Sequence, residues 1–248
     1  MKLTLIGYGF VGKAVHEVLK DYHEVKIVDP QYNDNVINND SDGYIICVPT
    51  PSTPSGACDM TIVETVVKSC PADKPILIKS TISLEGWETL MEHFPDRDIT
   101  FSPEFLRNNT AEQDLLNTKD FMFGGGNINF WQSVFVNVLG NISIGIADPR
   151  ELILVKYFRN SFLANKVAFF NQVYDLCEAT GINYDAVATG IGADKRIGTS
   201  HTEVTKERGF GGHCFPKDIQ AIIYTAKQNG IDLTLLKEAL EYNKKVRK

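Results

Sequence analysis

Lys2–Gly12 reads KLTLIGYGFVG, an apolar run that leads into a glycine-rich segment, and this stretch decides the fold class. We expect a strand over the apolar run, a helix from the turn to about Lys20, and a second strand over Val25–Val28. The second strand ends at Asp29, which follows Gly7 by roughly the 20 residues of a dinucleotide-binding unit. An acid at this place accepts hydrogen bonds from the adenine ribose and repels a 2′-phosphate, so NAD is favoured over NADP.

The glycines of this turn have separate physical tasks. Gly7 makes the tight turn, Gly9 lets the backbone approach a pyrophosphate, and Gly12 lets the helix pack closely on the strand. Phe10 and Val11 open the helix, whose N-terminus would face the same pyrophosphate. The pattern alone is weak, but the flanking strand, helix and acid make dinucleotide binding the preferred interpretation over a plain turn.

Strands and helices keep alternating through the first half of the chain. This alternation predicts an α/β fold with a Rossmann-type, doubly wound parallel sheet and helices on both faces. Further strands are expected at Tyr44–Val48, Ile76–Lys79, Ile99–Phe101, Phe121–Phe123 and Ile142–Ile144. Further helices are expected at Thr61–Ser69, Leu84–Phe94 and Ile128–Leu139. We therefore expect a NAD-binding domain over residues 1–147.

Three polar segments follow strands of this predicted sheet. They are Val48–Pro51 (VPTP), Lys79–Thr81 (KST) and Ser102–Arg107 (SPEFLR). Each alone fits an ordinary connection between strand and helix. Because ligands of such sheets bind beyond the carboxyl ends of the strands, the three together predict a site at the cofactor edge.

The second half of the chain reads as all-helical, and we expect a helical domain over residues 148–248. A helix begins at Asp148 and runs to Thr180, with apolar residues on nearly every side, so we expect it to be buried. Lys156 and Asn160 are four residues apart and share a face. A Lys in that setting needs a partner or a function; the alternative is an apolar stem that reaches water.

The remaining helices are expected over Asp218–Gln228 and from about Thr234 to the end of the chain. Before them a charged loop, Gly192–Gly209, holds Arg196. The last helix carries an apolar stripe over Leu236–Leu240, which needs a partner surface within the chain or on a second copy.

Gly209–Asp218 reads GFGGHCFPKD, and its Cys214 says more about chemistry than any other residue. The glycines before it let the backbone approach a ligand closely. Pro216 and Asp218 are helix-start residues with Lys217 between them, and a helix N-terminus and an ammonium both favour the reactive thiolate. The alternative is an inert, buried Cys beside a glycine-rich turn.

The bulk composition excludes several classes of protein. The chain has 248 residues, 43% of them hydrophobic and 23% charged, as in ordinary soluble globular proteins. A net charge of −6 without a basic stripe makes nucleic acid an unexpected partner. The apolar runs are too short for a membrane span, and the chain enters a strand directly, so we expect neither membrane segment nor signal peptide. The 5 cysteines, with no C-x-x-C pair, favour a reducing cytoplasm and argue against disulfides or a metal site.

In this order the motifs resemble those of the UDP-glucose/GDP-mannose dehydrogenase family, over the whole chain. The matching positions are the glycines at 7, 9 and 12, VPTP at 48–51 with Gly56 and Asp59, KST at 79–81, SPEFLR at 102–107, Glu151 with Lys156 and Asn160, Arg196-Ile197-Gly198, and the run 209–218. The combination is highly specific, and the SPEFLR form is similar to UDP-glucose enzymes rather than to the aminosugar branch.

The resemblance implies a two-step, four-electron oxidation of a nucleotide sugar's primary alcohol to a carboxylate, with two NAD⁺ consumed. It makes Cys214 the nucleophile that forms a thiohemiacetal and then a thioester. It gives Lys156 the positive charge beside the developing alkoxide, with Asn160 and Asp218 holding donors or water around it. Glu104 becomes the base that handles water in thioester hydrolysis.

The resemblance also implies binding roles. Thr81 would position a water or the nicotinamide, and further cofactor contacts are implied for Val48, Thr50 and Lys217. The implied substrate contacts are Glu104, Phe105, Leu106, Arg107, Asn108, Lys156, Asn160, Arg196 and Gly211.

The chain departs from the family pattern in several places, and one is the absence of the basic residue expected soon after Asp29. Asn108 stands where the family has Glu, and an amide cannot take up a proton at neutral pH. The loop from Arg196 to Cys214 looks longer than usual and lacks the family's aromatic stretch. Family members continue through a second domain that grips the nucleotide, so the chain reads as a short form, and lost remote contacts lower turnover as well as affinity.

Two other functions stay open beside the UDP-glucose dehydrogenase. A two-electron dehydrogenase of the hydroxyacid/6-phosphogluconate type also carries Lys and Asn four apart, but it needs no thiol. A non-catalytic or regulatory relic that binds NAD or a nucleotide sugar would explain Asn108 and the short chain. Separately from these alternatives, the family resemblance implies a homodimer formed through the last helix.

Overall fold

The computed structural model describes residues 1–33, 35–140, 142–212 and 214–248, and these form two compact units. The sheet unit comprises residues 1–53 and 58–156, and the helical unit comprises residues 54–57 and 157–248. The division falls inside one long helix rather than at its start. The domain boundary predicted at 147/148 stays a prediction.

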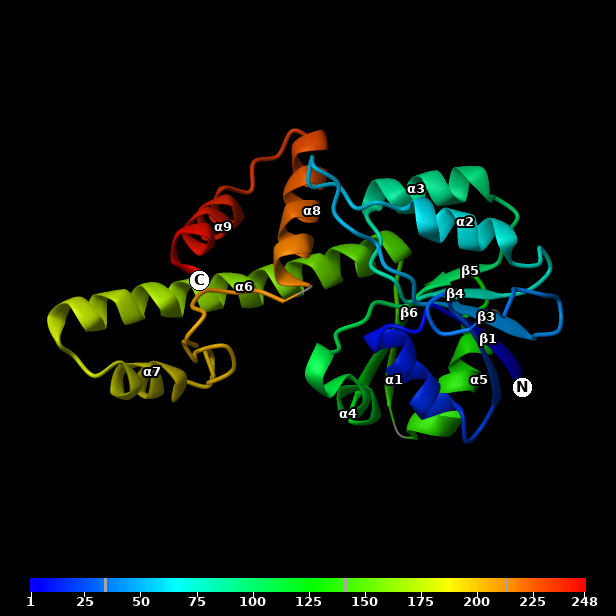
Figure 1. Cartoon of the computed structure of the whole chain (residues 1–248), viewed down its shortest axis with the longest axis horizontal. Coiled ribbons are helices and arrows are strands. Elements are labelled where there is room, and N and C mark those ends of the chain that lie inside the picture. The colour runs from blue at the N-terminus through cyan, green and yellow to red at the C-terminus, as the bar shows by residue number, and fades with distance from the viewer. Residues whose placement is uncertain (34, 141, 213) are drawn as a thin grey trace. The chain divides into compact units, whose positions relative to one another are not determined.

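The sheet unit is built on seven described strands in the order β2-β1-β3-β4-β5-β6-β7 (Figure 1). The strands are β1 Lys2–Ile6, β2 Glu24–Val28, β3 Gly43–Ile46, β4 Ile76–Ile78, β5 Ile99–Phe101, β6 Asp120–Gly125 and β7 Ser143–Ile146. Parallel pairs join β2 to β1, β1 to β3, β3 to β4 and β4 to β5. This confirms the α/β class. Strands β1 and β3 are neighbours; β2 lies beyond β1 on one side, and β4 to β7 follow β3 on the other.

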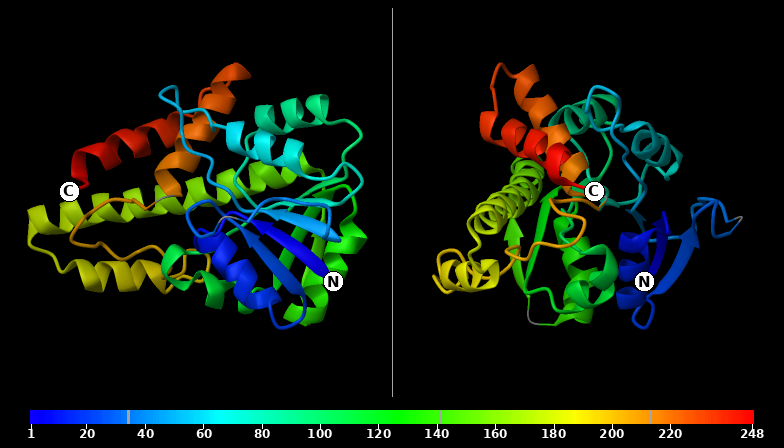
Figure 2. Two further views of the ribbon diagram at one scale, coloured as in Figure 1. Left: turned by 45° about the vertical axis from the view of Figure 1, so that its right-hand side comes forward. Right: turned by 60° about the vertical axis from the view of Figure 1, so that its left-hand side comes forward.

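Helices cover both faces of this sheet (Figures 1 and 2). They are α1 Phe10–Leu19, α2 Thr61–Ser69, α3 Leu84–His93, α4 Ala111–Leu116 and α5 Ile128–Leu139. On one face, α1, α4 and α5 enclose a core cluster that includes Leu5, Val15 and Trp131. The central strands β3 and β4 are apolar without alternation because both of their faces are buried, and each fully buried aliphatic side chain contributes about 1.5–3 kcal/mol.

Strand β6 runs antiparallel to β5, so the expectation of a wholly parallel sheet is wrong at this pair. Thr100 pairs with Gly125, and Phe101 pairs with Gly124. The connection from β5 carries a 3₁₀ turn, η1 Asn108–Thr110, and α4, which packs against α1. The chain therefore stays at the carboxyl edge and enters β6 from there. The six residues of α4 are too few for a periodic pattern, which is why the sequence did not reveal it.

The helical unit contains most of α6 Pro149–Thr180, together with α7 Tyr184–Gly192, α8 Phe215–Gln228 and α9 Thr234–Val246. Helix α7 was not expected, because its two glycines and its threonine weaken the helical pattern. The sequence did offer one signal, because Asn is a preferred N-cap residue. In the structure Asn183 is the N-cap, and its Oδ1 accepts a hydrogen bond from the Ala186 N–H at 3.2 Å. Helix α8 begins at Phe215, three residues before the expected start.

Helix α6 is not buried on every side, and that expectation is wrong. Phe162, Phe169 and Leu176 are 68%, 55% and 66% exposed, and their spacing of seven residues places them on one face. The opposite side packs instead, through Ala164 and Phe170 among others. Helix α6 therefore buries only part of its surface, although its sequence is apolar on nearly every side.

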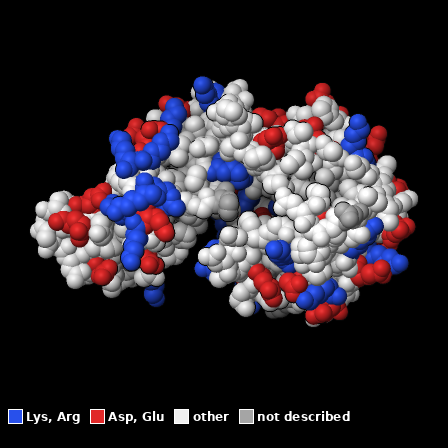
Figure 3. Space-filling view, viewed as in Figure 1, with Lys and Arg blue, Asp and Glu red and all other residues white. Residues whose placement is uncertain are grey.

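The stripe of α9 has its partner surface within the helical unit. Leu236 and Ala239 are buried there, and α9 packs against α8. Basic side chains gather around the C-terminal end of α9 (Figure 3), where Lys244 and Lys245 occupy the last turn and complement the helix dipole. None of the helices, over the part of the chain that the structure describes, combines the length and apolarity needed to cross a membrane.

Candidate active site

The glycine-rich turn has the geometry of a dinucleotide cradle. Gly7 has a φ of +91°, and a Cβ there would lie 2.6 Å from the Cys47 carbonyl oxygen. A Cβ on Gly12 would lie 2.1 Å from the Gly7 oxygen, whereas one on Gly9 would meet nothing within 4 Å. Gly7 and Gly12 are thus required by packing, and Gly9 leaves the α1 N-terminus open to a ligand.

Asp29 lies at the end of β2 beside this turn. Its Oδ2 accepts a hydrogen bond from the Tyr8 N–H at 2.6 Å, and its Oδ1 accepts one from the Gln31 N–H at 2.8 Å. These bonds orient the carboxylate, and each oxygen keeps a lone pair for a ribose hydroxyl. Phe10 and Val11 form the first turn of α1, half-buried next to the cradle. The residues present fit the adenosine and pyrophosphate portions of NAD.

The three predicted polar segments do meet at the carboxyl ends of β3, β4 and β5. Ser80 Oγ donates to the Val48 carbonyl oxygen at 2.8 Å, which joins the first two segments. Val48 and Thr50 are buried. Thr81 is half-buried, and its carbonyl oxygen accepts a weak hydrogen bond from Cys58 Sγ at 3.7 Å. Parallel topology brings these segments together although they are far apart in sequence.

The second and third segments are joined by a buried ion pair. Lys79 Nζ lies 2.9 Å from Glu104 Oε2 and donates to Ser102 Oγ at 3.3 Å. The other carboxylate oxygen, Oε1, accepts the Phe105 N–H at 3.0 Å. Sequence reasoning assigned no role to Lys79. The available signal was a charged residue directly after the short apolar strand β4.

Lys156 is buried within the sheet unit and does not extend to water. Its Nζ donates to the carbonyl oxygen of Glu104 and lies 5.6 Å from the centre of the Phe105 ring. This decides between the two readings of Lys156 in favour of a partnered side chain. The cation is therefore placed at the same segment as the candidate base.

The rest of this segment turns toward solvent. Arg107 makes a two-pronged pair with Asp114, with Nη2 to Oδ1 at 2.6 Å and Nε to Oδ2 at 3.0 Å. Hydrogen bonding to this guanidinium lowers the pKa of Asp114 to about 2. Leu106 is half-buried, and Asn108 is exposed as it opens η1. Arg107 is thus already engaged by its own unit.

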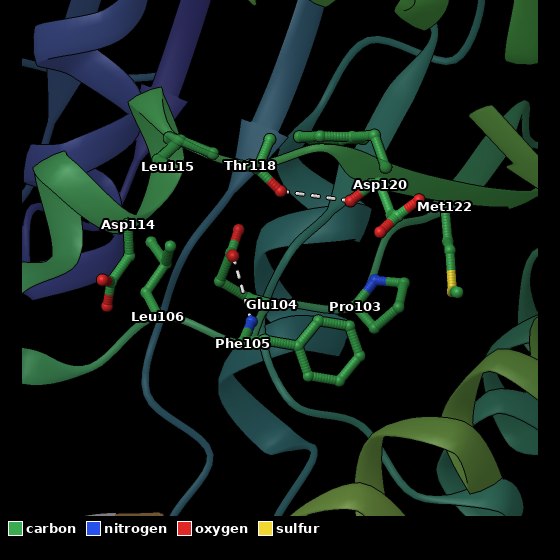
Figure 4. Close-up of a pocket in the computed structure, with 10 residues that line it drawn as sticks. Pro103, Glu104, Phe105, Leu106, Asp114, Leu115, Thr118, Asp120 and Met122 are labelled. Carbon is green, nitrogen blue, oxygen red and sulfur yellow. Dashed lines mark hydrogen bonds between the residues drawn. The ribbon is translucent and has the colours of Figure 1, made fainter. Parts of the chain in front are cut away.

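A pocket of about 70 Å³ lies beside Glu104, with room for a few water molecules. In Figure 4 the Glu104 carboxylate points into it, toward the space between Leu115 and Thr118. The lining residues are Pro103, Glu104, Phe105, Leu106, Asp114, Leu115, Thr118, Asp120, Phe121 and Met122. The pocket therefore gives a buried carboxylate a small polar space within the sheet unit.

In the helical unit, Cys214 is the N-cap residue of α8 and is half-buried. One turn later Asp218 is fully buried. It accepts a hydrogen bond from Asn160 Nδ2 at 2.6 Å, and its other oxygen lies 2.9 Å from Lys217 Nζ. The α8 N-terminus and the Lys217 ammonium supply positive potential near the thiol. His213, in the same predicted motif, lies outside the described residues.

The backbone leading to Cys214 is held by two buried asparagines. Asn171 Oδ1 accepts from Arg208 Nε and from the Gly209 N–H, both at 2.9 Å. Asn243 bonds both backbone groups of Phe210, at 2.6 Å to N and 2.9 Å to O. Arg208 and Gly209 have φ values of 58° and 54°, so this support stabilises a left-handed backbone. Sequence reasoning missed both asparagines because no local pattern separates them from surface amides.

Two predicted substrate contacts have partners of their own in the helical unit. A Cβ on Gly211 would lie 2.1 Å from the guanidinium carbon of Arg247. Arg196 is exposed and pairs with Asp194 through Nη2 and Oδ2 at 2.5 Å. A separate hollow of about 1040 Å³, between the end of α6, α7 and residues 199–204, is lined by none of the predicted site residues that the structure describes.

The predicted catalytic residues thus fall into two clusters. Thr81, Glu104 and Lys156 belong to the sheet unit. Cys214 and Asp218, with Asn160 and Lys217, belong to the helical unit. Across the described residues, no group of three or more His, Cys, Asp or Glu side chains has the arrangement of a metal site.

A glycine-rich turn, an acid ending the second strand and a mostly parallel sheet define the class of nicotinamide-dinucleotide-binding proteins. Residues 31–134 match the family model described as UDP-glucose/GDP-mannose dehydrogenase family, NAD binding domain. Residues 151–245 match the model for the central domain of the same family. The chain belongs to the UDP-glucose/GDP-mannose dehydrogenase family, and its cofactor is NAD.

Known proteins agree with this assignment. A UDP-glucose 6-dehydrogenase of Rickettsia bellii is 33% identical over 225 residues, which cover 86% of this chain and 51% of the relative. A UDP-glucose dehydrogenase structure from Pyrobaculum islandicum has a TM-score of 0.84 and 26% identity, covering 98% of this chain and 68% of that one. The chain spans about half the length of the curated relatives it matches.

A third similarity concerns the fold alone. The structure of a 3-hydroxyisobutyrate dehydrogenase from Mycobacterium tuberculosis has a TM-score of 0.73 at 17% identity, covering 98% of this chain and 92% of that one. The two-unit architecture is therefore shared beyond the family, and the residues must decide the chemistry.

Proposed function

We propose that this chain oxidises the primary alcohol of a nucleotide sugar with NAD⁺, converting UDP-glucose to UDP-glucuronate. The relatives named as UDP-glucose 6-dehydrogenases support the substrate. The observation that carries the proposal is Cys214 at the N-cap of α8, one turn from the buried Asn160–Asp218 pair. A thiol at that position suits covalent catalysis on an aldehyde.

The proposed chemistry needs a nucleophile for its second half. When bound, NAD⁺ accepts a hydride from the substrate carbon in each oxidation. After the first oxidation, the Cys214 thiolate bonds to the aldehyde carbon, and the oxygen takes a proton to give a thiohemiacetal. Loss of a hydride from carbon and of that proton leaves a thioester. Water then displaces the thiol and leaves a carboxylate.

We assign roles to the remaining site residues as follows. Lys156 supplies positive charge to the developing alkoxide, and Asn160 with Asp218 orients donors or water. Glu104 accepts the proton of the attacking water. We assign the nicotinamide side to Thr81, Val48, Thr50 and Lys217, and the sugar nucleotide to Phe105, Leu106, Arg107, Asn108, Arg196 and Gly211.

A two-electron dehydrogenase of the hydroxyacid type is the second candidate. It is favoured by the fold shared with 3-hydroxyisobutyrate dehydrogenase over 92% of that chain. Such an enzyme would use Lys156 and Asn160 without the thiol. The number of hydrides removed per substrate molecule distinguishes the two candidates.

The test is NADH absorbance at 340 nm with NAD⁺ and limiting UDP-glucose. We expect two NADH per UDP-glucose for the wild type and a loss of the second oxidation for Cys214→Ser, with Cys58→Ser, a half-buried thiol, as the matched control. A Cys214→Ser variant that still yields two NADH contradicts the thiol mechanism. A protein that binds NAD but forms no NADH with UDP-glucose, GDP-mannose or UDP-N-acetyl sugars contradicts the enzyme proposal and favours a non-catalytic binding role.

We also propose a cytoplasmic homodimer. The five cysteines are all free thiols, which suits a reducing compartment. The exposed apolar face of α6, with Phe162, Phe169 and Leu176, supports pairing with a second copy through the helical unit. Because the α9 stripe is already covered within the unit, α6 is the better-supported dimer surface.

A further inference from the structure

Lys79 is the most deeply buried charged side chain next to the candidate base. Its side chain has no exposed area, and its Nζ contacts Glu104 Oε2 at 2.9 Å and Ser102 Oγ at 3.3 Å. The same ammonium lies 4.5 Å from the centre of the Phe121 ring and 5.7 Å from that of Phe135. An ammonium has three donors, and here one hydrogen bond to Ser102, the ion pair with Glu104 and an aromatic wall surround it.

In this ion pair, each buried charged group has the other as its partner in place of water. A buried ammonium or carboxylate is costly alone, and removing one partner leaves the other uncompensated. Glu104 is fixed further by the Phe105 N–H on Oε1 and by Lys156 on its carbonyl oxygen. Lys79 is therefore the counter-charge that lies against Oε2 of Glu104, and the Phe105 N–H orients Oε1.

The other ionisable groups around Glu104 do not replace Lys79. Burial raises the pKa of Cys47, at the end of β3, to about 12, so it remains a neutral thiol. Lys156, from α6, donates a hydrogen bond from its Nζ to the backbone carbonyl oxygen of Glu104. Asp114 and Asp120 line the pocket and carry the same sign as Glu104, so neither neutralises it.

We propose that Lys79 is a positioning residue that holds the Glu104 carboxylate aimed into its pocket, where it can accept a proton. The Lys79–Glu104 ion pair is supported by the geometry of the sheet unit alone. That the pair serves catalysis rests on the proposed function. Lys79 would act through Glu104 and would not touch the substrate.

The first experiment needs no turnover. We compare the thermal stability of Lys79→Met, Glu104→Gln and the double variant. The matched control is Lys68→Met, since Lys68 is an exposed lysine of α2. Each single variant should lower the Tm by on the order of 10 °C, because each removes the counter-charge of a buried group, which must then stay charged without a partner or give up its charge. The double variant should regain most of that loss. A double variant no more stable than Lys79→Met, or one that fails to fold, overturns the proposal.

The second experiment reads the protonation of Glu104 directly. At neutral pH the infrared spectrum of Lys79→Met should gain a protonated-carboxyl band, because a buried carboxylate without a counter-charge takes up a proton. The band should be absent from the wild type, from Lys79→Arg and from the double variant. A Lys79→Met spectrum without that band contradicts the proposal. Where Lys79→Met does not fold, Lys79→Gln, which also removes the counter-charge but keeps a polar end, should show the same band, and its absence there is equally contradictory.

The third experiment separates the positioning role from the proposed function. In Lys79→Met the acid limb of the pH profile for NADH formation should move to higher pH, and Lys79→Arg should restore the wild-type limb. A uniform loss at every pH, with the limb unmoved, means that Lys79 is only structural and overturns the proposal. If pairing and infrared results hold but the wild type forms no NADH, the proposed function fails while the ion pair stands.

Discussion

The two units of this chain assemble their polar residues by different means. In the sheet unit, charged side chains from neighbouring strand ends meet directly, as Lys79 and Glu104 do. In the helical unit, neutral amides of Asn171 and Asn243 hold a loop in place, and the loop leads to Cys214. A parallel sheet brings strand ends to one edge by topology, whereas a loop among helices needs side chains to fix its path.

The strongest test of this contrast is Asn171→Ala. It removes the shared acceptor of Arg208 and Gly209 and leaves a half-buried guanidinium and a backbone N–H without that partner. We expect a loss of about 2–3 kcal/mol in the free energy of unfolding, measured by urea titration. Gln172→Ala, the exposed neighbour on the same helix, should cost about 0.5 kcal/mol or less. Equal losses in the two variants would break the comparison.

The matching test in the sheet unit is Gly12→Ala. Its Cβ would lie 2.1 Å from the Gly7 oxygen, so the turn must shift, and we expect about 2 kcal/mol of destabilisation. NAD affinity, measured by calorimetry, should fall with it.

Gly9→Ala is the control for that test. Nothing lies within 4 Å of its Cβ, so stability should change by about 0.5 kcal/mol or less, while NAD binding should still weaken about tenfold because the methyl meets the pyrophosphate. If Gly9→Ala binds NAD as well as the wild type does, the cradle is misassigned.

A smaller, pH-dependent effect is expected at Asp114. Its pKa is lowered to about 2 in the folded protein, so its pairing with Arg107 stabilises the fold above pH 4 and is lost as the pH falls from about 4 to about 2. Because Arg107 is largely exposed, we expect Asp114→Asn to cost only about 1 kcal/mol at pH 7 and nothing near pH 2. Chemical denaturation at both pH values measures it, with exposed Asp96→Asn as control. A cost that is the same at both pH values would contradict this account.

The smallest effect on stability is expected on the exposed face of α6. Phe162→Ser should change the free energy of unfolding by about 0.5 kcal/mol or less, because the ring is 68% exposed. It should nevertheless lower the dimer fraction measured by light scattering at tens of micromolar, whereas Tyr22→Ser, an exposed aromatic of the sheet unit, should not. A wild-type protein that is monomeric there contradicts the proposed dimer.

Prediction from sequence succeeded where the signal is local. Gly7, Gly9 and Gly12 with Asp29 specify the strand-turn-helix-strand unit that the structure contains, because each constraint acts within that unit. It failed at β6, where the direction of the strand depends on α4 packing against α1. It also failed for the exposed face of α6, because an apolar side chain does not reveal whether a neighbour covers it.

By itself the sequence determined the α/β class, the position of the glycine-rich turn, the three polar strand ends and the thiol at the head of a helix, since these follow from short-range periodicity and turn chemistry. Only the tertiary structure decided that Lys79 pairs with Glu104, that Lys156 is bound to the Glu104 carbonyl oxygen, and that Asn171 and Asn243 support the loop before Cys214. The physical reason is that the stability of a buried polar group depends on the partner it meets. Those partners lie on other strands and helices, which only folding brings together.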